Sequence, residues 1–138
     1  MSVQIAEFSL WCRVTVPKLV AGFKIFGFTI VPDEYVNETT ELVRVYPSAL
    51  GLDAKVSPDV VIDKLLSMGY CPVASEVVDE IIRCRTKSSK KGYIIVPLTS
   101  GSQMQLVIQN GIISHPDHCL LVGTVQNAGY AVIAARPV

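Results

Sequence analysis

Charged side chains are scarce in this chain of 138 residues, and neither sign of charge predominates. Only 17% of the residues are charged, against about a quarter in an ordinary soluble domain. Twelve basic side chains balance twelve acidic ones, so the formal net charge is zero. A neutral chain has no overall field to steer it toward nucleic acid or an anionic membrane surface, and any such binding has to be local.

From the sequence we also expect no secretory signal and no membrane span. The N-terminal segment has no basic stretch followed by an apolar core. The longest apolar run, Leu19–Val31, is shorter than the roughly 20 residues that a bilayer requires and is interrupted by Lys24. The four cysteines are far apart and form no C-x-x-C motif, which favours reduced thiols over a disulfide framework. We therefore expect a cytoplasmic protein with no membrane partner.

Recurrent catalytic motifs are missing as well. The chain contains no G-x-S-x-G, no phosphate-binding glycine loop ending in Lys and Ser or Thr, no H-E-x-x-H and no G-x-G-x-x-G. We expect no cofactor. The sequence favours a non-enzymatic binding protein, with a small enzyme or a ligand- or metal-binding protein as the alternative.

Hydrophobic residues, in contrast, make up half of the chain, and the mean hydropathy is +0.43. A chain of this length corresponds to one domain and can bury a core without disulfides or metals. No low-complexity segment or linker divides it, so a single domain is expected over residues 1–138. The excess of apolar residues indicates that part of the surface is covered by a partner.

Alternating apolar residues predict strands in the first and last thirds of the chain. The polar segment 32–40 predicts a connection, whereas Asn110-Gly111 is the dipeptide best suited to a type I′ hairpin turn. Residues 119–125 and 130–135 are apolar on both faces and predict a second hairpin at the centre of the sheet. The strands expected from these patterns are 8–16, 23–31, 41–46, 92–99, 103–109, 112–114, 119–125 and 130–135.

The middle of the chain carries helix signals. Ser57, Pro58 and Asp59 combine an N-cap, a proline at the first helical position and an acid near the positive end of the helix dipole. Apolar residues at helical spacing follow there and again further on, so helices are expected over about 57–68 and 74–85. Strands, then two helices, then strands predict an α+β fold: a mainly antiparallel sheet with both helices packed on one face.

The segment "SHPDHC" contains both histidines of the chain. His115, Asp117 and His118 are candidate metal ligands, and His118 with Cys119 is a candidate catalytic pair. One short segment cannot surround a tetrahedral ion, and no second ligand segment is evident. Adjacent residues of a strand also point to opposite faces, which disfavours a couple between His118 and Cys119. We interpret the segment as the turn before a strand.

Five of the twelve basic residues are packed into nine positions, from the last turn of the second expected helix to the start of the next strand. This concentration of charge is a candidate site for phosphate or nucleic acid, although no aromatic residue is interleaved for base stacking. A solvated loop is the simpler interpretation, since the negative end of a helix dipole also favours cations. The candidate residues are Arg83, Arg85, Lys87, Lys90 and Lys91.

The segment 23–31 is apolar on both faces when read as one strand. Phe23, Ile25 and Val31 fall on one side, and Phe26, Phe28 and Ile30 on the other. Two helices with single apolar stripes can cover only one side of the sheet. We therefore predict a homo-oligomer, most simply a dimer, with Phe26, Phe28 and Ile30 in the interface. Another protein partner is the alternative occupant of the same surface.

Overall fold

The computed structural model describes residues 8–83, 92–116, 125 and 129–137. In this part of the chain a 3-10 turn, η1 (Pro47–Leu50), precedes the helices α1 (Pro58–Ser67) and α2 (Ser75–Arg83). The strands are β1 (Leu10–Val20), β2 (Phe23–Ile25), β3 (Phe28–Val31), β4 (Glu34–Val45), β5 (Gly92–Pro97), β6 (Gln103–Gln109), β7 (Ile112–Ser114) and β8 (Tyr130–Ala135).

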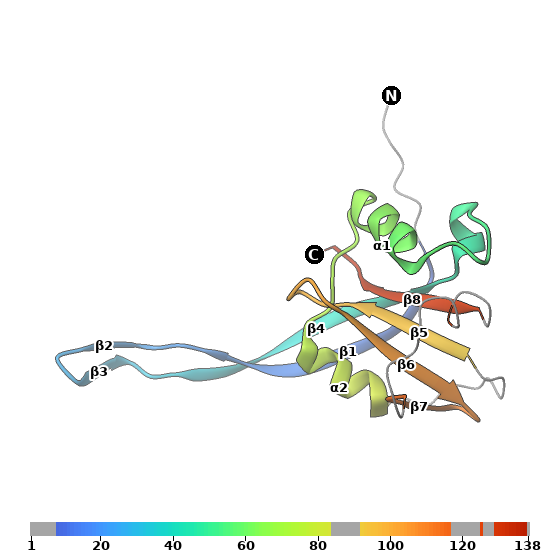
Figure 1. Cartoon of the computed structure of the whole chain (residues 1–138). Helices are drawn as coiled ribbons and strands as arrows, with labels where there is room; N and C mark the ends of the chain where they lie inside the picture. Colours follow the sequence, from blue (N-terminus) through green and yellow to red (C-terminus); the bar gives the residue numbers. More distant parts are fainter. Residues whose placement is uncertain (1–7, 84–91, 117–124, 126–128, 138) are drawn as a thin grey trace.

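Six of these strands form one curled sheet in the order β1-β4-β8-β5-β6-β7 (Figure 1). The neighbouring strands are antiparallel except for β5 and β8, which run parallel. Every residue of β8 is buried, as its two apolar faces predict for a central strand. The predicted α+β fold with a mainly antiparallel sheet and two helices is confirmed.

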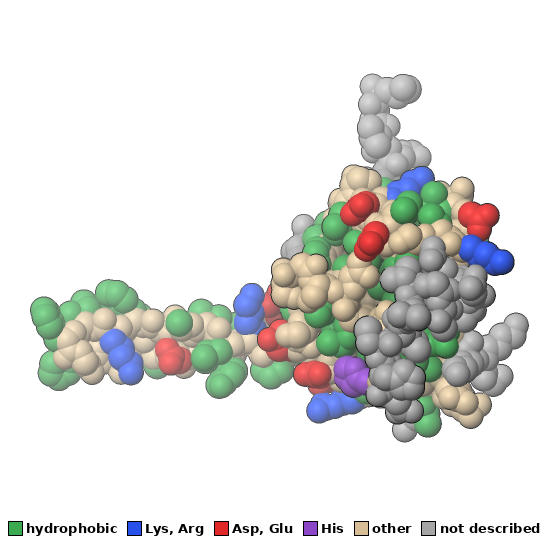
Figure 2. Space-filling view, viewed as in Figure 1, with side chains coloured by type: hydrophobic (Ala, Val, Ile, Leu, Met, Phe, Trp, Pro, Cys, Tyr) green, Lys and Arg blue, Asp and Glu red, His purple; other side chains and the backbone are tan. Residues whose placement is uncertain are grey.

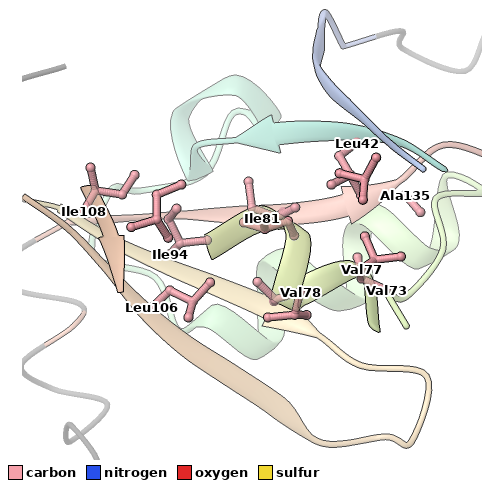
Figure 3. Packing of buried hydrophobic residues seen from close by; sticks show 13 residues of the cluster. Leu42, Val73, Val77, Val78, Ile81, Ile94, Leu106, Ile108 and Ala135 are labelled. Carbon is pink, nitrogen blue, oxygen red and sulfur yellow. The ribbon is translucent and has the colours of Figure 1, made fainter. Parts of the chain in front are cut away.

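The helices, however, cover opposite faces of the sheet, and the prediction that both pack on one face is wrong. Leu42 and Ile94 lie in the buried cluster that contains α2 (Figure 3). Their chain neighbours Val43 and Ile95 lie in the cluster that contains α1. Because successive side chains of a strand point to opposite faces, the two clusters are separate layers. The central strands are apolar on both faces, and each face needs a cover.

Local sequence signals mark the element ends well. α1 begins at Pro58 and is followed by Gly69, whose φ is 97°. The turn at Asn110-Gly111 has φ angles of 54° and 78°, as a type I′ turn requires. The other predicted hairpin is not seen: β8 has β4 and β5 as its sheet neighbours. Most of its expected partner, residues 119–125, lies outside the described residues, and Val125 is helical.

A tyrosine at the start of β8 ties the sheet to the segment before α1. The Tyr130 hydroxyl donates a hydrogen bond to the Val56 carbonyl at 2.6 Å, and burial raises the pKa of Tyr130 to about 12. The neutral phenol is therefore favoured in the folded state. Its contribution to stability is complete below about pH 10 and is lost as the pH rises through 12.

Tyr130→Phe should lower the free energy of unfolding by about 1 kcal/mol at pH 8, because the partly buried Val56 carbonyl loses its donor. The difference in unfolding free energy between wild type and variant should shrink by about 1 kcal/mol between pH 8 and pH 11. Over this range the Tyr130 phenol ionises in the unfolded wild type but not in the folded one, and the variant has no phenol at this position. Urea unfolding at the two pH values measures both effects. Tyr35→Phe, at a 74% exposed position, is the control. A difference that stayed constant with pH would contradict the assignment.

Candidate functional site: an apolar β-arm

The candidate metal and catalytic loop is only partly described. His115 follows β7 and is exposed, whereas Asp117, His118 and Cys119 lie outside the described residues. Within the described ranges, no group of three or more His, Cys, Asp or Glu side chains could hold a metal ion. Among the described residues, His115 therefore belongs to no such group.

Of the five basic residues proposed as a phosphate or nucleic-acid site, one lies in the described part of the chain. Arg83 ends α2, is exposed, and pairs with Glu80 at 2.8 Å, rather than with Asp79 as the i,i+4 spacing allows. Arg85, Lys87, Lys90 and Lys91 lie outside the described residues.

Among the helices that the structure describes, none has the length and apolar character needed to cross a bilayer.

The most distinctive feature is a long two-stranded ribbon that leaves the body of the protein (Figure 1). The pairing of β4 with β8 covers only Leu42–Val45, but the pairing of β1 with β4 continues outward to Val20 and Glu34. The hairpin of β2 and β3 lies at its far end. We call residues 17–37 the β-arm. The polar segment 32–40, predicted as a connection, instead contributes most of the arm's second strand, because a strand exposed on both faces does not need an apolar pattern.

Exposed hydrophobic side chains are concentrated on this arm (Figure 2). Ten of the fourteen large hydrophobic residues that are exposed in the described part of the chain belong to it. Surface apolar residues are normally scattered, and a contiguous group marks a site of interaction. The ten are Leu19, Val20, Phe23, Ile25, Phe26, Phe28, Ile30, Val31, Tyr35 and Val36.

The tip of the arm is a hairpin and not the single strand predicted over 23–31. Ile25 pairs with Phe28 across the two-residue turn Phe26-Gly27, and Phe23 pairs with Val31. Residues opposite each other in a ladder project on the same face, so the reversal gathers the apolar side chains on one face. The intervening pair, Lys24 and Thr29, projects on the other. We call Phe23, Ile25, Phe28 and Val31 the tip face; Ile30 is the additional residue of a bulge beside Val31.

The turn itself is strained. Phe26 has a φ of 51° and Gly27 a φ of 82°, the signs of a type I′ turn, in which Asn or Gly is preferred at the first position. A bulky residue at positive φ costs about 1 kcal/mol or more. Phe26 is also 97% exposed, so contacts with the described residues do not compensate for this cost. Strain of this kind points to a function outside the fold of the hairpin.

Phe26→Asn should separate the two roles of this residue. Relief of about 1 kcal/mol of strain should slow amide exchange in residues 23–31 roughly fivefold, measured where the protein is monomeric. Loss of the aromatic side chain should at the same time weaken the self-association predicted for the arm, measured as the dissociation constant between copies. If binding were unchanged or stronger, Phe26 would not belong to the interaction surface.

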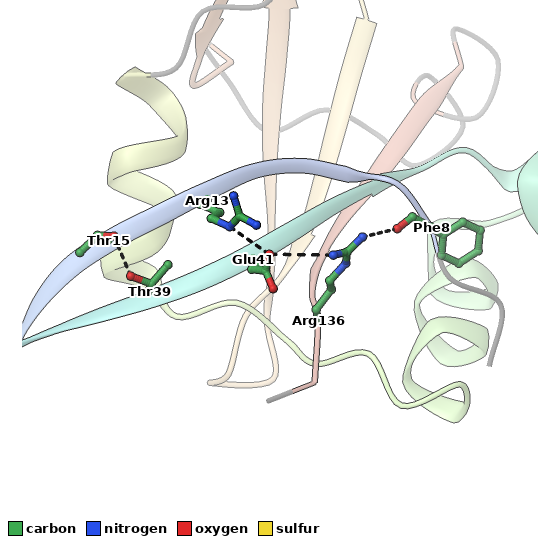
Figure 4. A network of polar contacts seen from close by, with 6 residues as sticks. All are labelled: Phe8, Arg13, Thr15, Thr39, Glu41 and Arg136. Atoms are coloured by element: carbon green, nitrogen blue, oxygen red, sulfur yellow. Dashed lines mark hydrogen bonds and ion pairs between the residues drawn. The ribbon is translucent and has the colours of Figure 1, made fainter. Parts of the chain in front are cut away.

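A network of polar contacts lies where the arm joins the body (Figure 4). Glu41 on β4 bonds Arg13 on β1 at 3.1 Å and lies 3.9 Å from Arg136, which follows β8. Arg136 in turn donates to the Phe8 carbonyl at 2.6 Å. Because this network connects both strands of the arm to the end of the central strand, the base of the arm is held to the body.

The neck of the arm, residues 21–22 and 32–33, joins the β1–β4 ribbon, which we call the shaft, to the β2–β3 hairpin at the tip. It requires glycine at position 22. A Cβ on Gly22 would lie 2.0 Å from the Val31 carbonyl oxygen, so no other residue fits this close backbone approach. The Gly22 amide also donates to the Asp33 carboxylate at 2.6 Å. The tip is therefore held in a defined orientation relative to the shaft, as an interaction element should be.

Comparison with protein-family models, with curated proteins and with solved structures finds no match. The assignment of the arm therefore rests on its own geometry. Phe26, Phe28 and Ile30, which the sequence predicts in an interaction surface, all lie at the end of the arm. The projection of the arm and the reversal at Gly27 were not predicted, although a glycine within an apolar run is itself a turn signal.

Proposed function

We propose that this protein is a non-enzymatic interaction protein that self-associates through its β-arm, as a dimer. The observation that carries the proposal is the uncovered apolar tip. Phe23, Phe26 and Phe28 are 54%, 97% and 74% exposed, and at roughly 200 Å² for each phenylalanine they present about 450 Å² of aromatic surface. The aliphatic side chains beside them extend the patch, which exceeds what a monomeric surface usually tolerates.

The stability of the arm supports the same proposal. A two-stranded ribbon alone in water is marginally stable, and three or more strands or a packed layer are needed for an apolar face. Within the described chain, β2 and β3 pair only with each other and have no third strand. Their large apolar side chains are exposed, so no described element covers them either. A second copy would supply the missing layer. Because the net charge is zero, two copies do not repel each other electrostatically as they approach.

Removal of the arm tests this function. Val16 and Glu38 are paired in the register, so the segment 17–37 can be replaced by an Asn-Gly turn that joins them. The armless protein should unfold cooperatively and sediment as a monomer at concentrations where the full chain associates. Association that persisted without the arm would disprove the proposal.

A further inference from the structure

Arg44 on β4 is a charged residue among apolar neighbours. Leu42, two residues before it, and Ile133, its partner on β8, are fully buried in the cluster that contains α2. Alternate residues of a strand project on the same face, as do residues opposite each other in a ladder, so Arg44 lies on the face that α2 covers. Its side chain is partly buried. An apolar residue would satisfy the packing at this position, and exceptions of this kind occur mainly at functional sites.

Two aromatic rings hold the Arg44 guanidinium. Its carbon lies over the Trp11 ring, 5.9 Å from the ring centre, and over the Tyr46 ring at 5.7 Å. β1 contains a bulge between Leu10 and Cys12, and Trp11 is the extra residue. Trp11 and Cys12 both pack against the α2 cluster, although neighbours in a regular strand project to opposite faces. The bulge therefore brings the indole beside Arg44, and bulges that redirect a side chain in this way are frequent next to binding sites.

The rings do not satisfy the hydrogen-bonding capacity of Arg44. Cation–π contacts engage the flat faces of a guanidinium, whereas its five N–H donors point outward in its plane. Within the part of the chain that the structure describes, no acceptor takes a hydrogen bond from these donors. The ion pairs found there involve other cations, namely Arg13, Lys18, Arg83 and Arg136. A partly buried cation without an opposite charge is unfavourable, and an anionic ligand would remove this cost.

We infer that Arg44, Trp11 and Tyr46 form a binding site for a small organic carboxylate. One guanidinium matches the single charge of a carboxylate and can bind both of its oxygens through parallel hydrogen bonds. The Trp11 Nε1–H and the Tyr46 hydroxyl are further donors, and Tyr46 is 49% exposed. The two rings favour a ligand with an apolar group beside its carboxylate over a small hydrated anion. The site lies on the body, so the inference goes beyond the self-association proposed for the arm.

The single tryptophan of the chain allows a direct test, because the protein has one indole N–H resonance in a nitrogen–proton NMR spectrum. Titration with cyclohexanecarboxylate should shift this resonance with a dissociation constant of about 1 mM. The neutral cyclohexanecarboxamide should bind at least about tenfold more weakly, since it lacks the charge. Arg44→Lys keeps the charge but not the planar fork, and should weaken carboxylate binding about tenfold.

Arg13→Lys is the matched control, because Arg13 lies on the neighbouring strand with a 65% exposed side chain that pairs with Glu41. It should leave the dissociation constant within about twofold of wild type. The inference is overturned if the acid and the amide bind equally, or if inorganic phosphate binds more tightly than the carboxylate. An indole resonance that stayed in place up to about 20 mM carboxylate would also overturn it. These comparisons use the unmodified protein and hold even if Arg44→Lys lowers its stability.

Discussion

Ile25→Asp is expected to weaken self-association about 100-fold or more while the body stays folded. Ile25 lies on the tip face and is 44% exposed in the single chain, so its replacement places no charge in the core. In the dimer, each copy would bury one carboxylate against apolar side chains, and an unpaired charge in such surroundings is strongly unfavourable. A 100-fold loss corresponds to about 2.7 kcal/mol, which two such carboxylates readily supply.

Ile112→Asp is a closely matched control. Ile112 is 49% exposed and, like Ile25, is next to a two-residue turn with positive φ angles, but it lies on the body. The same substitution should leave the dissociation constant within about twofold of wild type. Light scattering over a concentration series compares the two variants. Equal effects at both positions would show that added charge, and not the tip face, controls association.

Leu65→Ala and Ile81→Ala should each lower the free energy of unfolding by about 3 kcal/mol. Both side chains are fully buried, with 0% exposure, and the loss of three side-chain carbons leaves a cavity in the core. Leu65 belongs to the cluster on the α1 face and Ile81 to the cluster on the α2 face. Urea unfolding in the Ile25→Asp background measures both losses without a contribution from association.

The two losses should add to within about 0.5 kcal/mol in the double variant, because residues in separate layers share no packing partner. Ile81→Ala with Ile94→Ala is the comparison, since both residues lie in one cluster (Figure 3) and are expected to couple. Strong coupling between Leu65 and Ile81 would contradict the placement of the helices on opposite faces of the sheet.

The elements with strong local signals could be predicted from the sequence. Ser57-Pro58-Asp59 marked the start of α1, and Asn110-Gly111 marked the turn between β6 and β7. The face of the sheet that each helix covers could not be predicted from the helices alone, because an apolar stripe on a helix does not specify which side of a sheet it packs against. The uninterrupted run Ile94-Ile95-Val96 did contain that information: a strand buried on both faces requires two layers.

The arm was harder to predict because its strands have no core to face. Burial imposes the alternating pattern by which strands are recognised, and Glu34–Thr39 escape that constraint. The tip was misread for a second reason. Phe26-Gly27 replaces the usual Asn-Gly, and without the turn the alternation of 23–31 distributes its apolar residues over two faces instead of one. Whether Phe26, Phe28 and Ile30 contact another copy stays a prediction.

Sedimentation equilibrium of the unmodified protein tests the central claim most directly. The chain mass is 15.0 kDa, so a dimer through the arms predicts twice that mass, about 30 kDa, at micromolar concentration and a fall toward 15.0 kDa on dilution. A mass of 15.0 kDa at every concentration, with the arm intact, would contradict it.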